Sequence, residues 1–171
     1  GVWFLFAPFL VACCFGGVGG RGARPPPRTD TLAGYELGTL RSEVEQRATA
    51  AGDSLACEEL PERVGLKRTK CGIDDGSVRL ELLNNQLTSI RRDLPGGRSA
   101  SAARDDITAK YGPPVSSRED PGEEWAYRVY WAGTDSTSRL ELACPDTLRS
   151  DGCQTNAQRV TPTGLQQLRS P

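Results

Sequence analysis

The chain has 171 residues, and its 21 basic and 22 acidic side chains leave a formal net charge of −1. This balance excludes a strong overall attraction to nucleic acid, whose phosphates require a basic surface. The sequence contains no histidine, which excludes catalytic arrangements built on imidazole and removes the commonest metal ligand.

An uncharged apolar run opens the chain, from Val2 to Cys14, with Pro8 as its interruption. A membrane-spanning helix needs about 20 apolar residues, so this shorter run predicts the hydrophobic region of an export signal. At its end, residues 10–13 read Leu-Val-Ala-Cys and resemble the lipobox of bacterial lipoproteins. The resemblance implies that Cys13 becomes the acylated first residue of the mature protein. The alternatives are a signal cleaved elsewhere and an uncleaved anchor.

A spacer follows the lipidation box. Residues 15–34 are rich in Gly, Pro and Arg and offer too little apolar surface to offset the entropy of ordering. We therefore predict a signal peptide over residues 1–12, and a lipidated cysteine with a disordered tether over residues 13–34. Because the sequence starts at Gly1 and contains no methionine, we expect the initiator and the basic start of the signal to lie upstream.

The first half of the expected domain begins with a helix. Apolar residues recur at helical spacing from Leu40 to Ala51, with Thr39 as the N-cap and Gly52 as the stop. The next segment, residues 57–63, reads as an irregular connection. An antiparallel meander of three strands is then expected over residues 64–73, 77–83 and 86–92, with tight turns at 74–76 and 84–85.

The second half repeats this order. A helix is expected from Ala100 to Tyr111, capped by Ser99 or Ser101 and ended by Gly112. Residues 116–122 read as a polar loop. Three further strands are expected over residues 124–131, 138–144 and 153–160.

A short internal repeat links the two halves. The sequence Arg-Leu-Glu-Leu at residues 79–82 recurs 60 residues later at 139–142, and Gly52 recurs at the same offset as Gly112. We therefore predict an α+β fold made of two units, residues 35–95 and 96–169. Each unit would hold one helix and a three-stranded antiparallel meander, and a tandem pair would form one sheet with its helices on one face. The alternative is one α+β domain with two unrelated hairpin units.

Four cysteines lie in the expected domain, at positions 57, 71, 144 and 153. In an oxidising compartment an even set of this kind predicts two disulfides. Four cysteines allow three pairings, of which sequence proximity favours Cys57 with Cys71 and Cys144 with Cys153. A zinc site is the competing interpretation, but the spacings lack any Cys-x-x-Cys pair.

Aromatic residues gather on one face of the strand expected at 124–131, namely Trp125, Tyr127 and Trp131. Core packing of a central strand is one explanation. The other is a contact patch for a protein or glycan, because Trp and Tyr concentrate binding energy at interfaces. Tyr130 lies on the opposite face of the same strand and is the better candidate for exposure.

Motifs for catalysis are absent from the sequence. It contains no Gly-x-Ser-x-Gly elbow, Walker loop, dinucleotide fingerprint or Ser-x-x-Lys dyad. Its paired carboxylates fall in an expected turn, at Asp74 and Asp75, or at expected surface positions, and nothing places two of them across a cleft. We therefore expect a protein that is not an enzyme and that holds no cofactor and no metal.

The helix openings resemble a known envelope family. Residues 37–44, Leu-Gly-Thr-Leu-Arg-Ser-Glu-Val, and residues 107–114, Ile-Thr-Ala-Lys-Tyr-Gly-Pro-Pro, are similar to the helix, Gly-Pro and strand pattern of the SmpA/OmlA-type small lipoproteins. That group includes a lipoprotein of the outer-membrane β-barrel assembly machinery, and a similar unit occurs twice in secreted β-lactamase inhibitor proteins. The chain departs from the pattern in its domain cysteines and in Gly52-Asp53 after the first helix.

The resemblance implies a non-enzymatic module that presents one sheet face to a protein partner. We therefore expect a bacterial envelope lipoprotein, anchored to the membrane through its lipid and facing the periplasm or the exterior, with a protein partner and no nucleic acid. The alternative is a secreted or anchored inhibitor or ligand-capture protein.

Overall fold

The computed structural model describes residues 29–73, 76–97, 99–122, 124–133, 137–146 and 152–159. The expected signal, Cys13, most of the tether, and Asp74 with Asp75 lie outside the described residues. The elements are β1 (Thr31–Leu32), β2 (Tyr35–Glu36), α1 (Arg41–Ala51), β3 (Leu55–Arg63), β4 (Leu66–Ile73), β5 (Val78–Leu83), β6 (Gln86–Asp93), α2 (Ala100–Tyr111), β7 (Ser116–Glu119), β8 (Tyr127–Ala132), β9 (Ser138–Cys144) and β10 (Gln154–Arg159).

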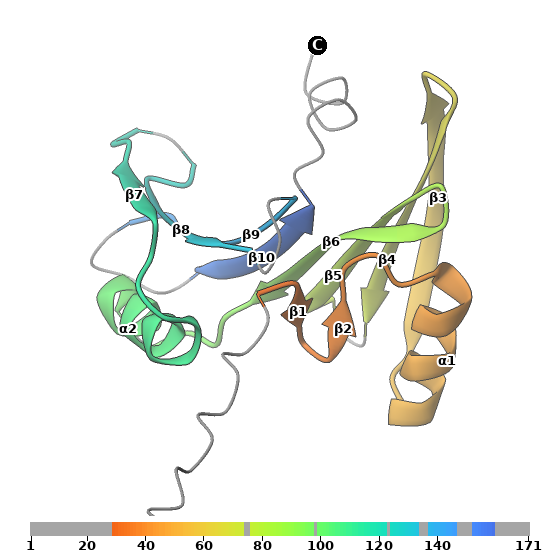
Figure 1. Cartoon of the computed structure of the whole chain (residues 1–171), viewed down its shortest axis with the longest axis horizontal. Coiled ribbons are helices and arrows are strands. Elements are labelled where there is room, and N and C mark those ends of the chain that lie inside the picture. The colour runs from red at the N-terminus through yellow and green to blue at the C-terminus, as the bar shows by residue number, and fades with distance from the viewer. Residues whose placement is uncertain are drawn as a thin grey trace, which may run out of the picture.

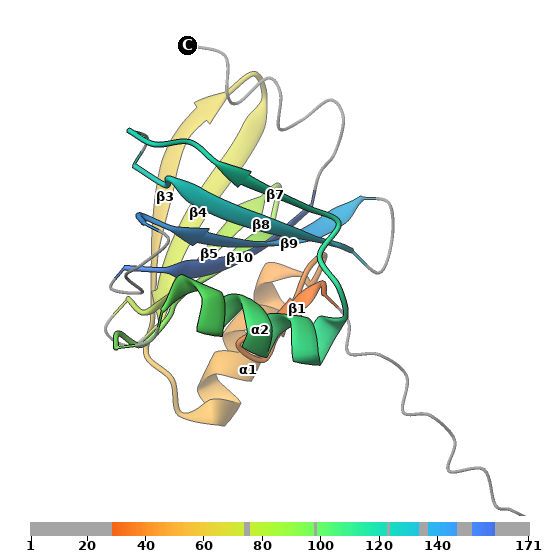
Figure 2. The ribbon, with the colours of Figure 1, turned by 90° about the vertical axis from the view of Figure 1, so that its left-hand side faces the viewer.

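One antiparallel sheet of eight strands dominates the molecule, in the order β3-β4-β5-β6-β10-β9-β8-β7 (Figure 1). The last strand of each half, β6 and β10, pair with each other, with Ile90 opposite Ala157. The sheet twists strongly along this order, so that β3 and β4 run steeply across the direction of β8 and β9 (Figure 2). Strands β1 and β2 form a separate small hairpin.

The predicted fold class is wrong. The protein is mainly β, and each helix is followed by four strands rather than three: α1 by β3 to β6 and α2 by β7 to β10. The two Arg-Leu-Glu-Leu stretches lie in β5 and β9, which are the third strands of their halves. Gly52 and Gly112 follow the ends of the two helices.

Two strands of the large sheet were not predicted from the sequence, and they are its edges. The sequence predicts an irregular connection at β3 and a loop at β7, because neither segment alternates apolar and polar residues. Every residue of β7 is exposed, and β3 buries none of its side chains fully. Natural edge strands carry charges and proline, which hinder pairing with a strand of another chain. Pro61 in β3 is an example.

The helix predictions are confirmed, with one difference in capping. α2 has the predicted bounds, and its N-cap Ser99 accepts a hydrogen bond from the Ala102 amide at 3.2 Å. α1 ends at Gly52, which takes a left-handed conformation with φ of 79°. The N-cap of α1 is Leu40 rather than Thr39, because the Thr39 hydroxyl instead donates to the Glu36 carbonyl at 2.7 Å.

A polar contact holds the start of α1 against the edge of the sheet. Arg41 forms ion pairs with Glu45 in its own helix and with Glu59 in β3, and the Thr69 hydroxyl donates to Glu59. The Arg41 guanidinium, helped by that hydroxyl, holds the pKa of Glu59 below its ordinary value. A lowered carboxyl pKa means that the contact supports the fold at neutral pH, and that this support is lost as the pH falls through the folded-state pKa.

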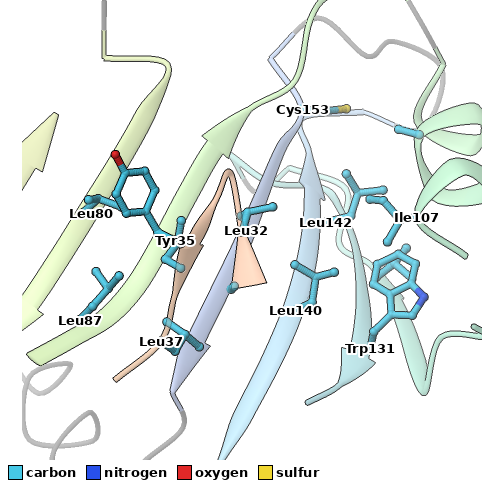
Figure 3. Packing of buried hydrophobic residues seen from close by; sticks show 14 of the residues in the cluster. Leu32, Tyr35, Leu37, Leu80, Leu87, Ile107, Trp131, Leu140, Leu142 and Cys153 are labelled. Atoms are coloured by element: carbon cyan, nitrogen blue, oxygen red, sulfur yellow. The ribbon is translucent and has the colours of Figure 1, made fainter. Parts of the chain in front are cut away.

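The hydrophobic core lies between the sheet and a layer formed by α1, α2 and the β1–β2 hairpin. The hairpin lies between the two helices (Figure 1), and its Leu32, Tyr35 and Leu37 are among the buried side chains of the core (Figure 3). The prediction that residues 29–34 belong to the tether is wrong, because Thr29 and Asp30 are buried and Leu32 belongs to the core. The fold therefore begins earlier than the sequence indicated.

Candidate functional site

The aromatic strand β8 divides its side chains between the two faces of the sheet. Trp131 and Tyr127 enter the core, with 1% and 7% of their surface exposed. The Trp131 ring nitrogen Nε1 donates to the Gly112 carbonyl at 3.0 Å and so joins β8 to the end of α2. These two residues are core residues. Trp125 lies before the strand and is half-buried.

Both disulfides have the pairing that sequence proximity favoured. Cys57 and Cys71 are directly opposite each other on β3 and β4, with their Cα atoms 4.0 Å apart. Cys144, at the end of β9, is bonded to Cys153, immediately before β10, with a Cα separation of 4.2 Å. The first bridge ties an edge strand to the sheet, and the second closes the connection between β9 and β10.

The side of the sheet that faces away from α1, α2 and the β1–β2 hairpin has no layer of secondary structure over it among the described residues. We call this side the open face. Strand register places its side chains in cross-strand rows. The central row consists of Ser116, Tyr130, Glu141, Asn156, Arg91, Arg79, Gly72 and Ala56.

The two flanking rows have the same polar character. One consists of Ala132, Arg139, Gln158, Ser89, Glu81, Lys70 and Glu58, and the other of Arg118, Arg128, Ala143, Gln154 and Asp93. Among the described residues of the three rows, Tyr130 carries the one aromatic ring, and every other side chain is polar, charged or no larger than alanine. These three rows of the open face therefore form a polar surface with several arginines.

In the second half of the open face, the side chains hold one another in place. Gln158 Nε2 donates to Glu141 Oε2 at 3.3 Å, and Arg128 Nη1 lies 3.9 Å from Glu141 Oε1. Glu141 is only 8% exposed, and it has one hydrogen bond and one long ion pair as its partners on this face. The Arg139 guanidinium lies 5.3 Å from the centre of the Tyr130 ring, in cation–π geometry. This half of the face is preorganised.

The first half of the open face is hollowed. A cavity of about 490 Å³ lies over β3 to β6. Its floor is formed by small residues, because Gly72 lies opposite Ala56 in the sheet and Ser89 lies nearby on β6. Five charged side chains line it: Glu58, Lys70, Arg79, Glu81 and Arg91.

A hydrogen bond joins the two halves at the centre of the open face. The Ser89 hydroxyl of β6 donates to Asn156 Oδ1 of β10 at 3.0 Å. Tyr130 and the hollow therefore belong to one continuous polar surface that crosses the junction.

The arrangement is suited to recognition through charge and hydrogen bonds. Within the described ranges, no three side chains of His, Cys, Asp or Glu come together as a metal site. No helix in the described part of the chain is long and apolar enough to cross a membrane.

Sequence reasoning found Tyr130 but missed the rest of the open face. The missed residues, such as Arg79 and Arg91, occupy alternate positions of strands that were correctly placed. The signal was present in the alternation, since the residues between buried ones must face the other way. Which strands lie side by side, and so which polar residues meet, depends on the pairing of β6 with β10.

No family model, curated protein or solved structure matched this chain. The role of the open face is therefore inferred from its own residues.

Proposed function

We propose that the protein is an exported, non-enzymatic binding domain that is tethered to a bacterial membrane and contacts a protein partner through its open face. The observation that carries this proposal is the open face itself. An eight-stranded sheet has its helices and its hairpin on one side, while the other side presents three polar rows.

The composition of the open face favours a protein as its partner. Protein interfaces are enriched in Arg and Tyr and carry many hydrogen bonds. The face supplies Tyr130 beside Arg139, together with a network around Glu141 that is already ordered before binding. Ordering before binding lowers the entropic cost of association.

The two disulfides favour a location outside the cytosol, because such bonds persist in oxidising compartments. Export through a signal over residues 1–12, with Cys13 as the first mature residue, is consistent with them. A lipid on Cys13 would anchor the domain durably if it carried two or more acyl chains. Residues 14–28 would then separate the membrane from the fold, which begins by Thr29.

The alternative function, an inhibitor or ligand-capture protein, is favoured by the hollow over β3 to β6. An assembly accessory needs a contact surface, whereas an inhibitor or capture protein also needs a recess or projection that engages one group closely. The hollow of about 490 Å³ provides such a recess.

Photo-crosslinking in the native bacterium tests the proposed function. A photoreactive amino acid at Tyr130 or Glu58, both on the open face, is expected to yield a protein adduct. The same amino acid at Gln46 of α1 or Lys110 of α2, both exposed on the helical side, is the matched control and is expected to yield none. Adducts from the helical positions alone would contradict the proposal.

The identity of the adduct separates the two functions. A component of the β-barrel assembly machinery would indicate an assembly accessory. A hydrolase that loses activity in a one-to-one complex would indicate an inhibitor.

Intact mass tests the proposed anchor independently. Expression of the full precursor in a bacterium is expected to give a mature species that begins at acylated Cys13, and blocking lipoprotein signal peptidase is expected to leave the signal attached. A mature species without acyl chains would contradict the anchor while leaving the binding proposal intact.

A further inference from the structure

The hollow over β3 to β6 has a counterpart in the second half of the sheet that is filled. The two Arg-Leu-Glu-Leu strands, β5 and β9, provide the comparison, because Arg79 and Arg139 occupy equivalent positions, as do Glu81 and Glu141. In the second half Arg139 packs on the Tyr130 ring and Glu141 is buried with its partners. In the first half the equivalent residues line an open cavity.

The first half of the open face is hollow because small residues occupy two positions of its central row. The position opposite Arg79 on β4 is Gly72, and the position opposite Gly72 on β3 is Ala56. Opposite Glu141 on β8 stands Tyr130, whereas opposite Glu81 on β4 stands Lys70. The first half therefore lacks the ring that covers the second, and its space is open to a group from outside the chain.

Two arginines lie side by side at the edge of the hollow. Arg79 and Arg91 are direct cross-strand partners on the open face, and like charges in that position destabilise a sheet. Arg79 is neutralised, because its Nη2 donates to both oxygens of Asp93 at 2.7 Å. Among the described residues no hydrogen bond or ion pair involves the guanidinium of Arg91, which is half-buried. Within the described part of the chain, Arg91 and Lys70 are thus the two cations of the hollow that form no ion pair with an acidic side chain.

The other charges of the hollow limit what that anion can be. Lys70 lies between Glu58 and Glu81 in its row, so this side of the hollow carries one excess negative charge. A phosphate, which carries close to two negative charges, would be repelled there more strongly than a carboxylate with one. The planar guanidinium matches a carboxylate and a phosphate equally well, so the weaker repulsion from Glu58 and Glu81 is what favours the carboxylate.

We propose that the hollow receives an Asp or Glu side chain from a loop of the partner protein, with Arg91 as its main binding residue and Arg79 as a neighbour. This inference rests on the proposed function, since it specifies what the partner presents to the open face. Charge-assisted hydrogen bonds of this kind contribute about tenfold to a hundredfold in affinity.

Selection of displayed loops tests the inference without knowledge of the natural partner. The probe is a phage library of disulfide-closed random peptide loops, selected on the wild-type protein. The selected loops are expected to share an Asp or Glu. Changing this acidic residue of the loop to Asn or Gln is expected to weaken binding to the wild-type protein by tenfold or more. The same change is expected to have almost no effect on binding to the Arg91→Gln variant. Arg91→Lys is expected to retain part of the affinity.

Arg118→Gln is the matched control, because Arg118 lies on the open face but far from the hollow, in β7. It is expected to bind the loops as wild type does. Loops that need Tyr130 but carry no essential acid would overturn the carboxylate inference and leave the proposed function standing. Loops that bind Arg91→Gln and Tyr130→Ala as tightly as wild type would count against the open face itself. Displacement of the loops by inorganic phosphate more readily than by acetate would overturn the choice of a carboxylate.

Discussion

Replacing Trp131 with alanine is expected to lower the free energy of unfolding by about 3–5 kcal/mol. The indole is 1% exposed, and it lies beside Ile107 and Leu140 in the core (Figure 3). Its Nε1 also donates to the Gly112 carbonyl at 3.0 Å. The variant therefore leaves a large cavity and removes the bond between β8 and the end of α2.

Urea unfolding followed by circular dichroism measures this effect. Tyr130→Ala is the matched control, because Tyr130 is the next residue on the same strand but faces the other way. Tyr130→Ala is expected to lower the free energy of unfolding by about 1 kcal/mol, which is the contribution of a partly exposed cation–π contact. Trp131→Phe keeps most of the core filled and is expected to fall between the two. Equal losses for Trp131→Ala and Tyr130→Ala would show that the assignment of faces in β8 is wrong.

Removing the disulfide between Cys144 and Cys153 by a double change to alanine is expected to cost about 2–5 kcal/mol. Both cysteines are completely buried, so the variant loses packing as well as the constraint on the unfolded chain. The corresponding change at Cys57 and Cys71 is expected to cost less, about 2–3 kcal/mol, mainly through the constraint, because Cys57 is exposed and loses little packing.

Unfolding of the two double variants, with the reduced wild type for comparison, tests this order. A mild reductant followed by alkylation gives a second measurement, in which Cys57 and Cys71 are expected to be labelled before the buried pair. Four thiols that react in the unreduced, denatured protein would contradict both bonds, and with them the argument for an oxidising compartment.

The sequence predicted the elements whose residues alternate or recur around a core. Both helices and the six inner strands were placed, because one side of each is buried: Leu80 and Leu82 in β5, for example, and Ile107 in α2. Gly52 and the pair Asn84-Asn85 marked a helix end and a turn, and the positive φ values of these residues agree with that use.

The edge strands and the β1–β2 hairpin could not be predicted from periodicity. β3 and β7 receive their place from backbone pairing with β4 and β8, which leaves no periodic signal in side chains that face water. The β1–β2 hairpin was hidden for a different reason. It is short, and its Leu32 follows a Pro- and Arg-rich segment that has the composition of a tether.

The binding face could be predicted only in part. Tyr130 was identified from its position opposite the aromatic residues of β8. The meeting of Arg91 with Asn156, and of Ser89 with Gln158, depends on the pairing of β6 with β10, which joins residues far apart in the chain. The hollow depends further on the absence of side-chain volume at Gly72 and Ala56, so it could be recognised only once the neighbours of these residues were known.

The most direct test of the open face as the binding surface is a chemical-shift map of the labelled domain with its crosslinked partner, or with a selected loop, added in solution. We expect the largest changes at Tyr130, Asn156 and Arg91, which span both halves of the open face, and no comparable changes in α1 and α2. Changes confined to the helices or to the β1–β2 hairpin would contradict the account and place the binding surface on the opposite side of the sheet.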